Sequence, residues 1–149
     1  MSRLNTALSR AAPYGYLALR VVAGLLFACH GMQKLFGIWT TQPMPAVGTE
    51  IWFAGLIELV CGLLVAVGLF TRIAAFLASG EMAVAYFQGH FKGDFADWHW
   101  VPVVNQGELA VLYCFIFLAF ALGGAGIFAL DGLFHRRAGP RPPDPEPRR

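Results

Sequence analysis

The chain has 149 residues, of which 57% are hydrophobic and 13% are charged, with a formal net charge of +2. A soluble domain of this length buries only part of its chain and carries about twice that share of charged residues. The composition therefore argues against a soluble enzyme, a nucleic-acid binder and a disordered protein, and it predicts a single integral membrane domain.

Residues 1–15 are polar and basic, and four apolar runs follow them. The runs cover residues 16–36, 51–70, 73–87 and 109–130. A helix needs about 20 residues to cross the hydrocarbon core, so the third run requires extension towards Phe91 or a locally thin bilayer. The runs are continuous rather than alternating, which disfavours a membrane β-barrel. We predict an all-α fold, a four-helix transmembrane bundle over residues 16–133.

The connections between the runs differ in kind. Residues 37–50 contain two prolines and indicate an ordered loop outside the bilayer, whereas Thr71–Arg72 leave room only for a tight antiparallel hairpin. Residues 88–107 contain Trp98 and Trp100, a residue type that favours the headgroup layer. Residues 134–149 are rich in proline and charge, and we expect a disordered tail.

Lysine and arginine counts predict the orientation. With the N-terminus inside, eight arginines face the cytoplasm: Arg3, Arg10, Arg72, Arg136, Arg137, Arg141, Arg148 and Arg149. The outer loops hold Lys92, with Lys34 at a helix end. This bias places both termini in the cytoplasm, as four spans require. Because Arg20 splits the first run and no small-residue cleavage site follows, we expect no removed signal peptide.

No metal site is predicted. The three cysteines, Cys29, Cys61 and Cys114, lie inside apolar stretches without zinc or haem spacing, and we interpret them as core residues. In the third connection His90 and His99 flank two aspartates, Asp94 and Asp97. These four residues allow a metal site, but solvated loop residues are the favoured interpretation.

Ionisable residues at membrane depth are the most informative feature. Each costs about 2.5–3.5 kcal/mol at a helix centre. Two fixed cations, one histidine and three carboxylates nearly balance: Arg20, His30, Lys34, Glu58, Glu81 and Glu108. Because buried charges persist when they are paired, we predict an interhelical polar cluster facing the bundle interior. It forms a ladder, since Arg20 and Lys34 are about 21 Å apart along one helix.

Small residues mark the helix faces that carry these charges. Gly55 and Gly62 flank Glu58, and Gly24 continues the side of the first helix that begins at Arg20. Close packing at small residues holds membrane helices together. We therefore expect the charged faces to be the packing faces.

Taken together, several stretches resemble the DoxX family of membrane proteins over about residues 14–133. The matching stretches are Arg20, His30–Leu35, Gly55–Glu58 with Gly62, Gly68–Arg72, Trp100–Pro102, Asn105–Glu108 and Asp131. The resemblance implies a multi-pass four-helix protein of the bacterial plasma membrane. Some relatives are subunits of thiosulfate:quinone oxidoreductase, and others are linked to membrane oxidoreductase complexes that handle thiol or oxidative stress. It also marks Arg20, His30, Lys34, Glu58 and Glu108 as family positions, whereas Glu81 comes from the charge argument alone.

Three functions remain open at this point. The first is a small membrane subunit or accessory protein of a redox system, a non-catalytic part of an oxidoreductase, with a quinone beside the polar cluster. The second is a structural or assembly module without a ligand, in which the charges only hold the helices together. The third is a pathway for protons or small solutes, although no broken helix recommends it. No cofactor is encoded and no catalytic residue is identified; membrane lipid, other redox subunits and a second copy of the chain are the partners considered.

Overall fold

The computed structural model describes residues 3–132, so the predicted tail at residues 134–149 lies outside the described residues. The described part is helical and contains no strand. Its elements are α1 (Arg3–Phe36), α2 (Glu50–Val67), α3 (Thr71–Val84), the π-helix η1 (Ala85–Phe91), the 3₁₀-helix η2 (Ala96–Trp98), α4 (Pro102–Asn105) and α5 (Glu108–Gly123). Both α1 and α2 are long and apolar enough to cross a membrane, and α5 is apolar but shorter.

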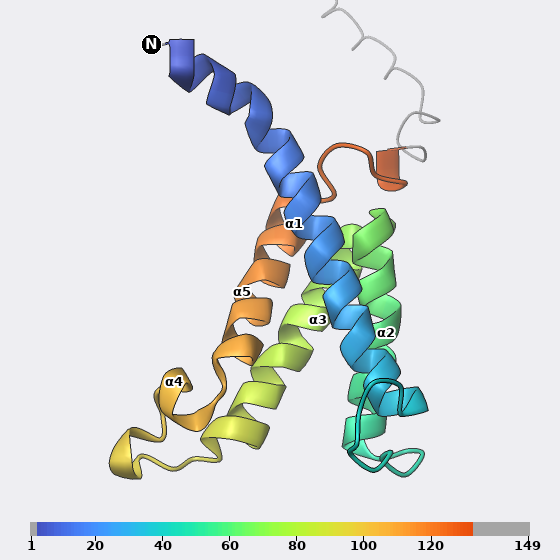
Figure 1. Cartoon of the computed structure of the whole chain (residues 1–149), viewed down its shortest axis with the longest axis vertical. Helices are drawn as coiled ribbons and strands as arrows, with labels where there is room; N and C mark the ends of the chain where they lie inside the picture. Colours follow the sequence, from blue (N-terminus) through green and yellow to red (C-terminus); the bar gives the residue numbers. More distant parts are fainter. Residues whose placement is uncertain (1–2, 133–149) are drawn as a thin grey trace, which may run out of the picture.

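The first helix begins earlier than the sequence indicates. It starts at Arg3 and continues through Pro13, so the basic segment predicted at residues 1–15 is, from residue 3, the first part of the helix. At 1.5 Å per residue its 34 residues span about 51 Å. In Figure 1 this first part extends beyond the other helices. The helix is therefore longer than a bilayer core of about 30 Å.

The ends of the other long helices also differ from the predicted runs. The third helical segment starts at Thr71 and continues through η1 to Phe91, which supplies the extension that the short apolar run required. α5 ends at Gly123, short of residue 130. Gly124 has a positive φ of 83°, a conformation that suits glycine, and it turns the chain out of the helix. Apolar character alone cannot reveal this stop.

The helices form two closely packed pairs, α1 with α2 and α3 with α5 (Figure 1). Glycines bring the first pair into near backbone contact: a Cβ on Gly24 would lie 2.7 Å from Ala66 N and 2.7 Å from Gly62 O. This confirms that small residues mark the helix contacts. In Figure 1 the two pairs diverge towards the end that carries α4.

Aromatic side chains fill the interior between the pairs. Phe27 of α1 lies 4.6 Å from Phe117 and 5.4 Å from Tyr113, measured between ring centroids. Phe27, Phe117 and Phe120 are fully buried. Large apolar side chains such as Leu25 and Phe115 are exposed on the outside of the same helices. An apolar outer surface over an aromatic interior is what a lipid-facing bundle presents.

Candidate functional site

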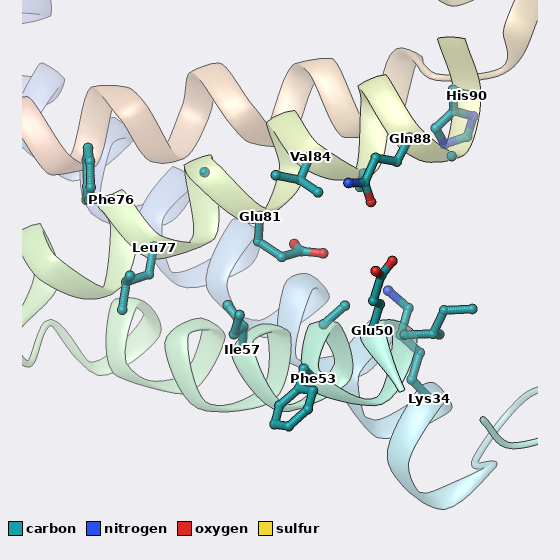
Figure 2. Close-up of a pocket in the computed structure, with 15 residues that line it drawn as sticks. Lys34, Glu50, Phe53, Ile57, Phe76, Leu77, Glu81, Val84, Gln88 and His90 are labelled. Atoms are coloured by element: carbon teal, nitrogen blue, oxygen red, sulfur yellow. The ribbon is translucent and has the colours of Figure 1, made fainter. Parts of the chain in front are cut away.

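A cleft of about 900 Å³ lies between α2 and α3 and continues along η1. Its walls are apolar and include Phe53 and Ile57 of α2 and Phe76 and Leu77 of α3. Polar side chains gather at one end of it: Lys34, Glu50, Glu81, Gln88 and His90. Figure 2 shows Glu81 and Gln88 reaching from α3 and η1 towards Glu50 and Lys34 on the opposite side. The cleft therefore has an apolar body and a charged end.

The charged end is built on an ion pair between α1 and α2, in which the carboxylate is buried and the lysine is partly exposed. Lys34 Nζ donates a hydrogen bond to Glu58 Oε1 at 2.7 Å. Glu58 is only 2% exposed, and Gly55 one turn earlier makes room for the lysine stem, since a Cβ there would lie 2.8 Å from Lys34 Cβ. The absence of a side chain at Gly55 thus lets α1 approach closely enough for the pair to form.

Two carboxylate oxygens near this pair are buried without a hydrogen-bond partner in the described chain, Glu58 Oε2 and Glu81 Oε2. Glu81 also interacts electrostatically with both Glu58 and Lys34. A buried acceptor without a donor costs about 1–3 kcal/mol, and more when it is charged. The cluster therefore favours a proton or a hydrogen-bond donor beside these oxygens.

The π-helix η1 shapes the polar end from the side of α3. It brings Gln88, Gly89 and His90 to the cleft. His90 Nδ1 lies 3.1 Å from the carbonyl oxygen of Asn105, which can only accept, so the ring donates from this nitrogen. A π-turn within a helix is uncommon and often marks a functional site. Here the π-helix places polar side chains at the charged end of the cleft.

Arg20 lies in a different part of the molecule from this cluster. Its guanidinium is 1% exposed and donates hydrogen bonds to the carbonyl oxygens of Ala125, Ile127 and Phe128, in the loop after α5. The expected pairing of a buried charge is here made with backbone dipoles, because the early end of α5 leaves these carbonyls without helical partners. Arg20 thus anchors the loop and is not part of the cleft.

The remaining two predicted residues also lie apart from the cleft lining. His30 packs edge-on against Tyr113 of α5, with ring centroids 6.2 Å apart. Glu108 is exposed in the first turn of α5, where a carboxylate suits the helix dipole. The structure therefore brings together Lys34, Glu58 and Glu81, with His30 near enough to interact electrostatically with Glu58, and it does not bring Arg20 or Glu108 to them.

Two members of the polar end, Glu50 and Gln88, were not predicted from the sequence, and a third, His90, was predicted to be a loop residue. Glu50 opens α2, where an acidic residue is explained by the helix dipole alone. Gln88 and His90 follow the end of the third apolar run, and only the continuation of the helix as η1 places them at the cleft. Within residues 3–132 no group of three or more metal-ligating side chains is arranged to hold a metal ion.

The DoxX family model matches residues 15–91, which include α2, α3 and most of α1. The chain belongs to the DoxX family. Its apolar helices agree with the membrane location of a relative in this family. The DoxX match also covers the cleft residues from Lys34 to His90.

Three relatives extend this result over most of the chain. A Haemophilus influenzae protein named "Uncharacterized protein" is 44% identical over 130 residues, covering 84% of this chain and 94% of its own. The Bacillus subtilis "Putative oxidoreductase CatD" is 31% identical, covering 78% and 84% of the two chains. An uncharacterized membrane protein of Mycobacterium tuberculosis is 29% identical, covering 85% of each. No solved structure matches the chain.

Proposed function

We propose that this DoxX protein is a small membrane subunit or accessory protein of a redox system, and that the cleft between α2 and α3 holds a quinone for a redox partner. The single observation that carries the proposal is the form of the cleft, an apolar body that ends in charged groups on three elements. A quinone has the same division, with an apolar tail and a polar ring. The relative named as an oxidoreductase supports a redox setting for the family.

The apolar residues of the cleft explain how such a ligand would enter. Phe53, Phe76 and Leu77 line it and are each more than half exposed on the outer surface. A ligand dissolved in the bilayer can therefore enter sideways from the lipid without crossing water. Its ring would reach Lys34 and Glu81, while its tail would stay among apolar side chains.

We place this arrangement in the bacterial plasma membrane with four crossings and both chain ends in the cytoplasm. The positive-inside bias of the sequence supports this orientation. The charged end of the cleft would then lie near the outer surface, because Lys34 is at the end of α1 far from Arg3. A quinone ring at this depth is accessible to proton exchange and to a partner at that surface.

The experiment is to purify the protein in native lipid nanodiscs and to identify the co-purifying quinones by mass spectrometry. A Leu77→Trp variant, which places a larger side chain in the cleft, is expected to lower the quinone content several-fold. Leu25→Trp, at an exposed position of α1, is the matched control and should leave it unchanged. Equal quinone content in the wild type, in both variants and in empty nanodiscs would refute the proposal.

A structural or assembly module is the second candidate, and the Lys34–Glu58 pair favours it because the pair joins α1 to α2. This candidate predicts that changes at the cleft alter abundance and melting temperature without affecting any bound ligand. The same nanodisc experiment separates the two functions, since only the first predicts a loss of ligand from a stable Leu77→Trp protein.

A further inference from the structure

The polar end of the cleft offers more hydrogen-bond acceptors than donors. Glu50 and Glu81 can only accept when ionised, and Glu81 Oε2 is buried without a partner in the described chain. The His90 ring adds a further acceptor when it is neutral, because its Nδ1 donates to Asn105 and its other nitrogen then carries a lone pair. The donors are Lys34, which already donates one hydrogen bond to Glu58, and the amide of Gln88, which also carries an acceptor oxygen.

From this balance we infer that the cleft binds the reduced, hydroxyl-bearing form of a quinone in preference to the oxidised form. The inference rests on the proposed function and specifies its ligand. A quinone carbonyl can only accept hydrogen bonds, so it places its lone pairs against those of Glu81 when that carboxylate is ionised. A quinol hydroxyl can donate to Glu81 and accept from Lys34 at the same time. Only the hydroxyl satisfies both kinds of group.

The position of Glu81 explains why the quinol would bind more tightly than the quinone. Its carboxylate points into the space between α2 and α3, opposite Lys34 and Glu50 (Figure 2). The Lys34 ammonium is drawn towards Glu58 by the 2.7 Å ion pair, which leaves Glu81 without a donor from the described chain. A ligand that brings its own donor therefore relieves a cost that the oxidised form would leave in place.

The experiment compares the two redox forms of one probe on the full chain. Decylubiquinone and decylubiquinol, kept reduced under argon, are titrated against the protein in nanodiscs by intrinsic tryptophan fluorescence, with empty nanodiscs as background. We expect the quinol to bind about tenfold more tightly or better, since a hydrogen bond to a charged group changes affinity by at least that order. The wild-type ratio alone decides the preference.

A substitution then assigns the preference to one residue. Glu81→Gln keeps the shape and introduces an amide N–H that can donate to a carbonyl, so we expect the quinol-to-quinone affinity ratio to fall to one or below. Glu108→Gln, the same change at an exposed position outside the cleft, should keep the wild-type ratio. Monodisperse elution and unchanged helicity by circular dichroism show that each variant is folded.

The outcomes distinguish this inference from the proposed function. If both redox forms bind equally, or if the quinone binds more tightly, the inference is overturned while the quinone site stands. A ratio that survives Glu81→Gln in a folded protein also overturns it. If neither form binds, and the lipophilic cation tetraphenylphosphonium binds instead, the proposed function falls together with the inference.

Discussion

Lys34 Nζ lies 2.7 Å from Glu58 Oε1 and joins the end of α1 to the middle of α2. The carboxylate is almost completely buried, whereas the lysine is about one-third exposed and reaches the cleft. A buried ion pair of this kind contributes little net stability against an apolar replacement, but the loss of one partner leaves a charge in the interior. We therefore expect removal of one partner to destabilise the fold more than removal of both.

Lys34→Met should lower the free energy of unfolding by about 3–5 kcal/mol, because Glu58 then remains buried without its cation. The double variant Lys34→Met with Glu58→Met should recover most of that loss, since both charges are removed. Thermal denaturation in detergent measures the effect as melting temperatures of the two single variants and the double variant. Strictly additive losses would contradict the pairing.

Arg20, in the middle of α1, provides a second prediction. Arg20→Lys keeps the charge but replaces a planar fork by a single ammonium, which cannot reach three carbonyls of the 125–128 loop together. We expect a loss of about 2–3 kcal/mol and faster proteolysis of the chain after α5. Limited proteolysis with mass mapping detects the second effect. Wild-type cleavage in this variant would show that the loop does not depend on the guanidinium.

The close approach of α1 and α2 gives a third prediction. Gly62→Ala should be strongly destabilising, because the new Cβ would lie 2.6 Å from the backbone nitrogen of Ala28. Gly80→Ala is the matched control on α3: no atom lies within 4 Å of its Cβ position, and alanine is the better helix former. We expect a fall in melting temperature for the first and none for the second. Similar melting temperatures for the two variants would contradict the packing of α1 on α2.

Part of this architecture could be read from the sequence. The helical class, the helix contacts at Gly24 and Gly62, and the family follow from apolar runs, small residues and the stretches from His30 to Arg72. These signals are local or periodic, so they survive without knowledge of the tertiary structure. The candidate charges could also be picked out, because each interrupts or borders an apolar run.

The arrangement of those charges could not be read in the same way. The two terminal nitrogens of Arg20 donate to backbone carbonyls, which have no signature in a sequence and become available only because α5 ends at Gly123. Glu50 and His90 were both predicted to lie in connecting loops, and only the start of α2 at Glu50 and the π-helix place them at the cleft. Partners of a charge are set by tertiary geometry, and so is its burial at a helix end, since Glu108 is exposed despite its apolar neighbours.

The predicted four crossings and cytoplasmic termini give a fourth prediction. Alkaline phosphatase, which is active outside, and green fluorescent protein, which is fluorescent inside, can each be fused after Phe36, after Phe91 and at the C-terminus. We expect phosphatase activity at the first two positions and fluorescence at the third. Phosphatase activity at all three positions would place the two ends of the chain on opposite sides of the membrane.

The most direct test of the central claim is photolabelling of the native protein with an azido-quinone, followed by peptide mapping with and without excess unlabelled quinone. If the cleft between α2 and α3 holds the ring, competitor-sensitive label should fall on residues 50–57 and 76–90, which line the cleft on its two sides. Label confined to the outer faces of α1 and α5, and unaffected by competitor, would contradict the account.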